Sequence, residues 1–211
     1  MSSDILIDTP ADETLATLLL AHGAGAPMDS EFMQMLAQAL CRHGIRVLRF
    51  EFPYMAARRV DGRKRPPNPM PALLTHFREL LVQQPGPVFI GGKSMGGRVA
   101  SLLAEEPGVS GTLCFGYPFH PPGKPDKLRT AHLLELTRPV LIIQGSRDPF
   151  GKAADVAGYR LSEQVQLQWL ESGDHDFRPL KASGRTQSQL IEQAAQAAAG
   201  FCRRHAGVGT V

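Results

Sequence analysis

The sequence predicts an α/β protein: a three-layer α/β/α sandwich built on a mostly parallel sheet of about six to seven strands. Apolar runs of strand length alternate along the chain with segments of helical period, which indicates βαβ units. Several runs are continuous, as at 15–21 and 139–144, which is typical of strands buried on both faces of a parallel sheet. The chain has 211 residues, 43% of them apolar, so we expect residues 1–211 to form one domain with its core over about 5–205.

The elements of the first half follow from this pattern. Strands are expected at 15–21 and 45–52, with a weaker one near 5–7. Between the first two, apolar residues recur at helical spacing over 29–43, and Gly44 follows as a residue that can end a helix.

Residues 53–71 interrupt the alternation. They hold five prolines and a basic cluster between Arg58 and Arg65, so we expect a loop or loose turns there. The cluster could hold an anionic substrate near a pocket, but a solvated face is the preferred interpretation.

The second half resumes the alternation of strands and helices. Further strands are expected at 88–90, 111–117, 139–144 and 165–170. Helices are expected at 72–84, 98–106, 153–161 and 188–205.

Charge and composition exclude several classes of protein. The 23 basic and 20 acidic residues leave a formal net charge of +3, which is too small to indicate a nucleic-acid-binding protein. The three cysteines are far apart and form no CxxC pair, so neither a disulfide framework nor a zinc site is expected. The segment Met1–Pro10 lacks the features of a secretory signal, and no apolar stretch approaches the roughly 20 residues of a membrane helix. We therefore expect a cytoplasmic protein with no membrane segment.

Polar residues that directly follow the predicted strands are the candidates for function, because ligands of open α/β sheets bind beyond the carboxyl ends of the strands. One such junction, Gly92-Lys93-Ser94-Met95-Gly96, matches the G-x-S-x-G pattern of a nucleophile elbow. In that turn the backbone is strained and the serine hydroxyl is exposed, while the glycines avoid collisions with the facing strand and helix. The pattern therefore indicates Ser94 as a nucleophile.

The same residues also resemble the end of a phosphate-binding P-loop. That motif requires a glycine at position 87, where the chain has Pro87, and residues 88–90 form an apolar strand instead of a flexible loop. A P-loop is therefore disfavoured.

A serine nucleophile needs a histidine as base and an acid that orients the histidine. In the arrangement that a nucleophile elbow serves, the acid follows the serine along the chain and the histidine follows the acid. Asp148 and His175 supply that order, each just after a predicted strand. Each alone also fits a turn residue or an exposed loop histidine, but their conjunction with Ser94 favours a catalytic triad.

An acyl-transfer site also needs backbone N–H groups that stabilise a developing oxyanion. One is expected from Met95, the residue after the nucleophile, and the other from Ala24, in the turn after the first core strand. His22 begins that turn and is interpreted as a residue that stabilises it. The residues expected to line the pocket are Gly23, Gly25, Lys93, Tyr117 and His120. The histidines in helical or near-helical stretches are interpreted as structural: His43, His76, His132 and His205.

Four longer motifs resemble one family. They are HGAGAPMDSEFM (22–33), RFEFPYM (49–55), GRKRPPNP (62–69) and GGKSMGGR (91–98). They are similar to the α/β-hydrolase superfamily, in particular to a dienelactone-hydrolase-like branch that includes testis-expressed relatives and a subunit of the NSL histone-acetyltransferase complex. The resemblance covers the chain from Leu15 to about Phe201.

The resemblance implies an α/β-hydrolase fold and a role for each candidate residue. Ser94 would be the nucleophile, Asp148 the acid and His175 the base, with Met95 and Ala24 as the oxyanion hole. Only residues 120–138 lie where many esterases insert a helical cap, so we expect no cap domain and a rather open site.

Together these observations predict a serine hydrolase that cleaves an ester or related acyl bond through an acyl-enzyme intermediate. A small-molecule acyl substrate is expected, and neither a metal nor an organic cofactor is needed. The alternative is a catalytically weak binding or scaffolding module on the same fold, and a protein partner or homo-oligomer is compatible with both. Basic residues near an open site suggest small acidic acyl compounds as substrates.

Overall fold

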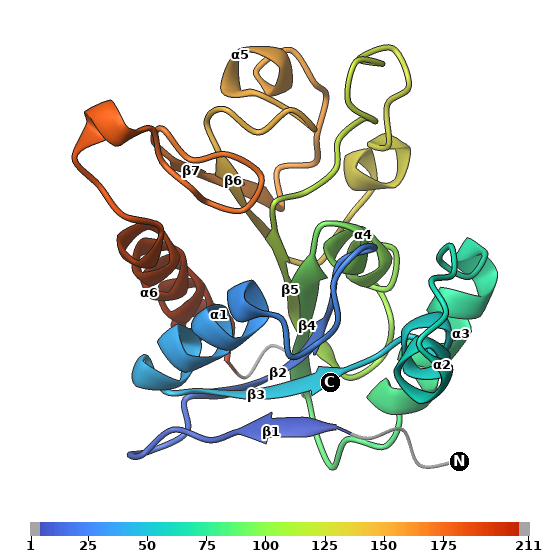
Figure 1. Ribbon diagram of the computed structural model, residues 1–211. Coiled ribbons are helices and arrows are strands. Elements are labelled where there is room, and N and C mark those ends of the chain that lie inside the picture. Colours follow the sequence, from blue (N-terminus) through green and yellow to red (C-terminus); the bar gives the residue numbers. More distant parts are fainter. Residues whose placement is uncertain (1–4, 207–211) are drawn as a thin grey trace.

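The computed structural model describes residues 5–206 and contains a seven-stranded sheet at its centre (Figure 1). The strands lie in the order β1-β3-β2-β4-β5-β6-β7, and neighbours are parallel except for β1 and β3. Their bounds are β1 Leu6–Asp8, β2 Ala16–Ala21, β3 Ile45–Phe50, β4 Val88–Lys93, β5 Val109–Phe115, β6 Val140–Gly145 and β7 Val165–Leu170. The predicted mostly parallel sheet is confirmed, including its weak first strand.

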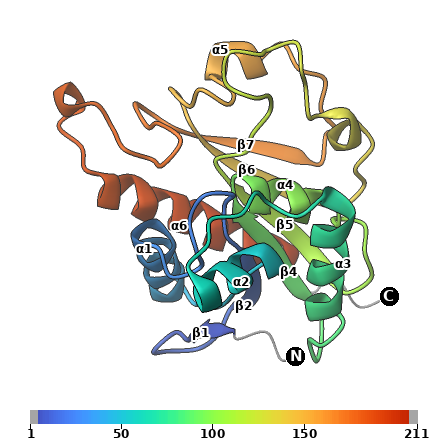
Figure 2. The same ribbon diagram turned by 45° about the vertical axis from the view of Figure 1, so that its right-hand side comes forward.

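Helices cover both faces of the sheet and complete the three predicted layers (Figures 1 and 2). Their bounds are α1 Glu31–Arg42, α2 Pro53–Asp61, α3 Met70–Leu81, α4 Met95–Ser101, α5 Ala153–Val156 and α6 Gln187–His205, with short 3-10 helices η1 Ala131–Leu134 and η2 Lys181–Ser183. Helices α1 and α6 pack together on one face, and α3 and α4 pack together on the other.

Alternate residues of each central strand face the two helical layers. In β2, Leu18 and Leu20 belong to the core cluster with α1 and α6, whereas Leu19 and Ala21 belong to the cluster with α3 and α4. All four side chains are fully buried. A strand covered on both faces needs apolar residues at every position, which explains the continuous run at 15–21.

The expectation of a loop at 53–71 is wrong for residues 53–61, which form the helix α2. Pro53 lies in the first turn of this helix, where its missing N–H costs no hydrogen bond. The Tyr54 side chain is buried, and Gly62, with a φ of 71°, ends the helix. The remaining prolines of the segment lie between Gly62 and the first turn of α3. The prolines of this segment mark the start of α2 and the start of α3. The residues that follow Pro53 are numerous enough to form a helix before Gly62.

The connection between β5 and β6 has no helical cap. Residues 116–139, all of which the structure describes, form loops and the 3-10 helix η1. The expected fold without a cap domain is therefore confirmed.

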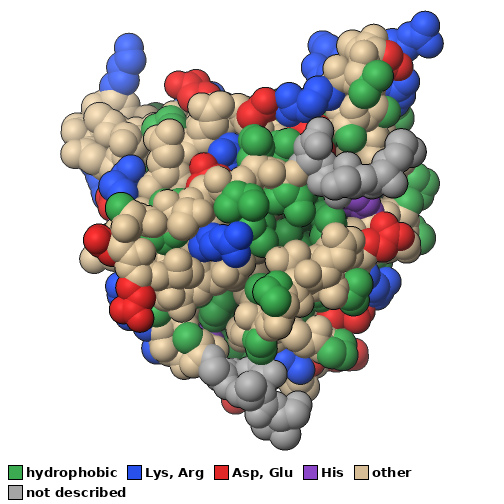
Figure 3. Space-filling view, turned by 90° about the horizontal axis from the view of Figure 1, so that it is seen from below, with side chains coloured by type: hydrophobic (Ala, Val, Ile, Leu, Met, Phe, Trp, Pro, Cys, Tyr) green, Lys and Arg blue, Asp and Glu red, His purple; other side chains and the backbone are tan. Residues whose placement is uncertain are grey.

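The surface of the molecule carries both signs of charge. Seen from below, hydrophobic side chains gather near the middle of the face, with basic and acidic side chains around them (Figure 3). This mixture agrees with the small formal net charge of +3. Among residues 5–206, no helix combines the length and apolar character needed to cross a bilayer.

Candidate active site

Ser94 lies in a sharp turn between the end of β4 and the start of α4. Its backbone has φ 52° and ψ −114°, a positive-φ conformation that costs energy for a residue with a Cβ. Strand β4 runs three residues further than its apolar pattern indicated, to Lys93, because Gly91 and Gly92 also pair with β5. The Ser94 N–H donates to the Phe115 carbonyl oxygen at 3.0 Å, which ties the turn to β5. The surrounding sheet thus holds the strained residue.

The glycines on either side of Ser94 allow the turn to be this tight. A Cβ on Gly92 would lie 2.7 Å from the backbone nitrogen of Gly97, and a Cβ on Gly96 would lie 2.6 Å from the His22 carbonyl oxygen. Both separations are shorter than a van der Waals contact, and both partners are backbone atoms. Helix α4 therefore packs against the ends of β2 and β4 with no room for a side chain, which explains the G-x-S-x-G spacing.

Asp148 lies in the turn after β6, with its side chain fully buried. Its Oδ1 accepts the Phe150 N–H at 2.8 Å, and its own N–H donates to the Gly145 carbonyl oxygen at 3.0 Å. Gly145 also lets the loop after β7 come close, because a Cβ there would collide with the Asp174 carbonyl oxygen. The acid is thereby brought next to the loop that carries His175.

His175 bridges the acid and the serine. Its Nδ1 lies 2.8 Å from Oδ2 of Asp148, and its Nε2 lies 3.0 Å from Oγ of Ser94. Because a carboxylate only accepts, Nδ1 carries the proton and Nε2 presents its lone pair to the serine hydroxyl. The Phe150 ring packs against the imidazole, with the ring centroids 4.3 Å apart. The three residues that the sequence order singled out thus meet in one hydrogen-bonded chain, an arrangement that can take a proton from a serine.

Lys93 fastens the histidine loop to the strand that precedes Ser94. Its Nζ donates to the His175 carbonyl oxygen at 2.8 Å and lies 3.3 Å from Oδ1 of Asp176. The same Nζ lies 5.3 Å from the ring centroid of Phe32, within the range of a cation–π contact. Burial lowers the pKa of Lys93, and the negative charge of Asp176 opposes that shift.

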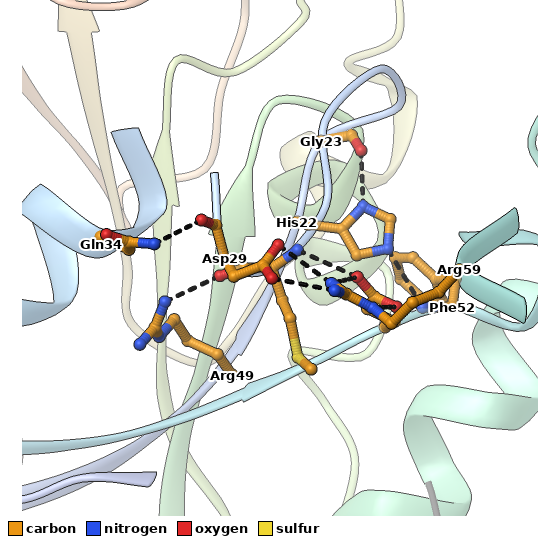
Figure 4. Close-up of polar contacts among 9 residues, drawn as sticks. His22, Gly23, Asp29, Gln34, Arg49, Phe52 and Arg59 are labelled. Atoms are coloured by element: carbon orange, nitrogen blue, oxygen red, sulfur yellow. Dashed lines mark hydrogen bonds and ion pairs between the residues drawn. The ribbon is translucent and has the colours of Figure 1, made fainter. Parts of the chain in front are cut away.

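The turn after β2 is held by two neutral side chains, His22, which Figure 4 shows, and Tyr54. The Phe52 N–H donates to Nε2 of His22 at 3.1 Å, so Nδ1 carries the proton and donates to the Gly23 carbonyl oxygen at 2.6 Å. The Tyr54 hydroxyl donates to the Ala24 carbonyl oxygen at 2.8 Å. Burial lowers the pKa of His22 and raises the pKa of Tyr54 to about 12. His22 therefore supports the turn with an uncharged ring, as its position in the sequence suggested.

The two amides expected to stabilise an oxyanion remain candidates. Met95 is the first residue of α4, so its N–H has no acceptor within the helix. The Ala24 N–H belongs to the same planar peptide unit as the Gly23 carbonyl, so the hydrogen bond from His22 sets its direction. Within residues 5–206, neither amide donates a hydrogen bond to another group of the chain.

A network of charged residues supports the same turn from the side of α2 (Figure 4). Arg59 pairs with Asp29 at 2.9 Å and with the buried Glu51 at 2.5 Å. Arg49 donates to the Met28 carbonyl oxygen at 2.9 Å. The hydrogen bond from Arg59 lowers the pKa of Asp29. The basic cluster at 58–65 thus contributes to structure, and none of its side chains lines the cavity beside Ser94.

That cavity has a volume of about 290 Å³ and opens next to the Ser94 hydroxyl. Its walls come from the turn after β2, the start of α1, and the loops after β4, β6 and β7. Three of the residues expected to line a pocket do so: Gly23, Gly25 and Lys93. Ala24, His175 and Asp176 also line it, whereas Asp148 lies behind the histidine.

Tyr117 and His120 do not line this cavity, which corrects their expected position. Tyr117 is fully buried, its N–H donates to the Gln144 side chain at 2.6 Å, and its hydroxyl donates to the Arg129 carbonyl oxygen at 2.8 Å. His120 is also buried, and its N–H donates to the Phe150 carbonyl oxygen at 3.2 Å. The chain after β5 turns into the core instead of along the rim of the sheet.

The sequence interpretation missed six of the residues that line the cavity: Ala26, Ser30, Phe32, Met33, Phe150 and Asp176. Phe32 and Met33 belong to an apolar helix pattern, which does not distinguish a cavity wall from a core face. Phe150 and Asp176 each lie within two residues of a triad candidate, and this closeness along the sequence could have indicated that they line the cavity.

A second serine and histidine lie in contact at the end of α4. Oγ of Ser101 lies 2.9 Å from Nε2 of His132 and also donates to the Arg98 carbonyl oxygen at 2.9 Å. Ser101 is fully buried. Burial first, and the charge of Arg98 second, lower the pKa of His132 to about 4. This pair faces no described cavity and is interpreted as structural.

Within residues 5–206, no group of three or more His, Cys, Asp or Glu side chains is placed to hold a metal ion. A second cavity of about 290 Å³ lies between the connection from β1 to β2 and the end of α1, next to Cys41 and Arg42. It contains no serine–histidine pair.

Comparisons with known proteins agree with this architecture. A family model described as an alpha/beta hydrolase domain matches residues 14–203. Dienelactone hydrolase from Anabaena variabilis is 21% identical, with a TM-score of 0.70 over 95% of this chain and 91% of that chain. An alpha-beta serine hydrolase homologue from Coxiella burnetii is 20% identical, with a TM-score of 0.68 over 92% of this chain and 90% of that chain. An a/b serine hydrolase without lid from Xanthomonas campestris is 19% identical, with a TM-score of 0.62 over 92% of this chain and 88% of that chain. At these identities the solved structures show a shared fold.

Proposed function

The chain belongs to the alpha/beta hydrolase domain family, and on that premise we propose that it is a serine hydrolase that cleaves an ester or related acyl bond. Ser94 is the nucleophile, His175 the general base and acid, and Asp148 the group that orients the imidazole. One observation carries the proposal: the hydrogen-bonded chain from Asp148 through His175 to Ser94, with distances of 2.8 and 3.0 Å. It ends at a cavity of about 290 Å³ in which an acyl group can lie.

The reaction follows from the protons in this chain. Nε2 of His175 takes the hydroxyl proton as Oγ of Ser94 attacks the carbonyl carbon, and the buried carboxylate of Asp148 stabilises the imidazolium that forms. The carbonyl oxygen becomes an oxyanion, which the Met95 and Ala24 amides stabilise by roughly 3–4 kcal/mol each. The imidazolium then protonates the leaving alcohol, and the acyl group remains on Ser94.

Water completes the cycle. His175 takes a proton from a water molecule, whose oxygen attacks the acyl carbon, and the collapse of the second tetrahedral intermediate returns the proton to Oγ of Ser94. The carboxylic acid leaves, and the enzyme is regenerated. The chain supplies the base, the nucleophile and the two oxyanion donors, and water is the second nucleophile.

The cellular setting is part of the proposal. Cys41, Cys114 and Cys202 are free thiols, which is usual in a reducing compartment. We therefore place the enzyme in the cytoplasm and assign it a small-molecule acyl substrate.

A fluorophosphonate probe tests the proposal directly, because such probes modify only an activated serine. The wild-type chain should be labelled at Ser94, and Ser94→Ala should not be labelled. Ser101→Ala is the matched control and should be labelled like the wild type. Absence of labelling in a folded wild-type chain, together with no hydrolysis of p-nitrophenyl esters, would favour the binding or scaffolding interpretation.

A further inference from the structure

We propose that the site hydrolyses esters of short, uncharged, apolar acyl groups, and that the Lys93–Asp176 pair disfavours acidic acyl groups. This inference rests on the proposed function and deepens it by naming the substrate class. It differs from the suggestion, made from the basic residues alone, that the substrates are acidic.

The size and chemistry of the cavity limit the acyl group. About 290 Å³ is at the lower end of the volumes that small-molecule sites occupy. Its walls are mainly the apolar side chains of Phe32, Met33 and Phe150, with small residues in the turn after β2. Met33 is almost completely buried, so the wall behind it is core that a longer chain cannot displace cheaply. An acyl chain of a few carbons therefore fits without disturbing the fold.

The lysine in the cavity wall, Lys93, already has partners for its charge. Nζ of Lys93 donates to the His175 carbonyl oxygen at 2.8 Å, lies 3.3 Å from the Asp176 carboxylate and contacts the face of Phe32. Its side chain is only 8% exposed, so its ammonium group is turned towards these partners and not towards a ligand. No other lysine or arginine is among the residues that line the cavity.

The acid of the pair is more accessible than the base. The Asp176 side chain is 43% exposed and lines the same cavity, with Arg178 no closer than 3.8 Å. A carboxylate on the substrate would therefore meet a carboxylate of the protein and would lose its hydration in an apolar pocket. Both effects act against acidic acyl groups and leave neutral ones unaffected.

A panel of four p-nitrophenyl esters tests the inference, with acetyl, butyryl, octanoyl and hemisuccinyl as the acyl groups. We expect kcat/KM for the butyryl ester to exceed that for the octanoyl ester and that for the hemisuccinyl ester by about tenfold or more each. The hemisuccinyl and butyryl groups have equal numbers of carbon atoms in the chain, so that comparison isolates the charge. A value for either the octanoyl or the hemisuccinyl ester equal to or above the butyryl value overturns the inference.

Two variants assign the selectivity to named side chains. Asp176→Asn removes the negative charge with little change in shape and should raise the ratio of hemisuccinyl to butyryl kcat/KM by about tenfold. Asp126→Asn, at an exposed position away from the cavity, is the control and should leave that ratio unchanged. Phe32→Ala should raise the ratio of octanoyl to butyryl kcat/KM, because it removes a wall of the cavity. An Asp176→Asn ratio equal to that of the wild type contradicts the role of the pair.

These experiments distinguish a wrong substrate class from a wrong proposed function. Labelling of Ser94 together with a preference for long or acidic esters leaves the serine hydrolase intact and overturns the inference. Absence of both labelling and hydrolysis overturns the proposed function, and the substrate class falls with it. Circular dichroism of each variant shows whether a changed ratio comes from a folded protein.

Discussion

Within residues 5–206, two serine–histidine contacts have almost equal lengths in very different surroundings. Oγ of Ser94 lies 3.0 Å from Nε2 of His175, and Oγ of Ser101 lies 2.9 Å from Nε2 of His132. The first serine lies in a positive-φ turn at the edge of a cavity, and the carboxylate of Asp148 stands behind its histidine. The second serine is fully buried at the end of α4, and its histidine is flanked by the positive charge of Arg98.

The comparison teaches that the position of the imidazole proton matters more than the distance between Oγ and Nε2, because the two distances are almost equal. Asp148 fixes the proton of His175 on Nδ1, so Nε2 is free to accept from the Ser94 hydroxyl. In the other pair, the Ser101 hydroxyl donates to the Arg98 carbonyl oxygen, so the ring of His132 must donate to Oγ. A histidine that donates cannot at the same time serve as a base for the same oxygen. Only the first pair is therefore arranged for nucleophilic chemistry.

The largest expected effect separates the two serines. Ser94→Ala should reduce kcat for a p-nitrophenyl ester by about 10⁴- to 10⁶-fold, because it removes the proposed nucleophile. Ser101→Ala should leave kcat within about threefold of the wild type and cost about 1 kcal/mol of unfolding free energy, since it removes one buried hydroxyl. Steady-state hydrolysis and urea denaturation measure the two quantities. A comparable loss of kcat in both variants would break the distinction between the pairs.

The next largest effect concerns the acid that only one pair possesses. Asp148→Asn should reduce kcat by about 10⁴-fold, because the amide NH₂ would donate to Nδ1 and leave the proton on Nε2 of His175. The binding of a neutral substrate should change much less, so KM serves as the internal comparison. His132→Gln, in the pair without an acid, should keep kcat near the wild-type value. Equal activities of Asp148→Asn and wild type would mean that His175 needs no partner on Nδ1.

A smaller effect tests the backbone that presents Ser94. Gly96→Ala should lower the free energy of unfolding by about 1–3 kcal/mol and reduce kcat, because its Cβ would lie 2.6 Å from the His22 carbonyl oxygen. Gly86→Ala is the matched control, since a Cβ there meets nothing within 4 Å. Gly86→Ala should leave stability unchanged or slightly raised. Chemical denaturation of both variants provides the comparison, and similar losses in the two would show that close packing at the elbow is unimportant.

The smallest expected effect is a pH dependence that comes from the structural pair. The pKa of His132 is about 4 in the folded chain and 6.5 in its unperturbed state, so the unfolded chain binds more protons between these values. Stability contributed by the neutral ring is therefore complete above pH 6.5 and is lost as the pH falls towards 4. The thermal midpoint should decline between pH 7 and pH 5, and the decline should be shallower in His132→Gln. Equal slopes in the two proteins would contradict this assignment.

Much of the fold and the candidate site followed from the sequence because strand ends are local features. The continuous apolar run at 15–21 indicated β2, and a glycine-flanked serine after such a run indicated the turn at Ser94. The helix α2 was missed because its first residue, Pro53, and the prolines before α3 together look like the prolines of a single loop. Tyr117 was misplaced because the direction of a chain after a strand depends on tertiary partners such as Gln144.

The contacts that complete the cavity are tertiary and left little trace in the sequence. Lys93 and Asp176 are 83 positions apart, and nothing in the spacing of charges along the chain predicts that they pair. The same holds for Arg59, which reaches Asp29, in the turn after β2, from helix α2. Sequence patterns indicated which residues follow the strands. Only the packed structure shows which charged side chains pair with one another.

The edge position of β7 has a consequence for how the proposed activity is lost. Among residues 5–206, this strand pairs only with β6, most of its side chains are half-buried, and the loop with His175 follows it directly. Opening of a sheet margin requires less free energy than global unfolding, because fewer apolar contacts are broken. Fraying at this margin would withdraw the imidazole while the interior strands stay protected from hydrogen exchange. On heating, activity should therefore be lost before the circular dichroism of the helices. The temperature of inactivation would then measure the stability of the β7 edge and not that of the central strands.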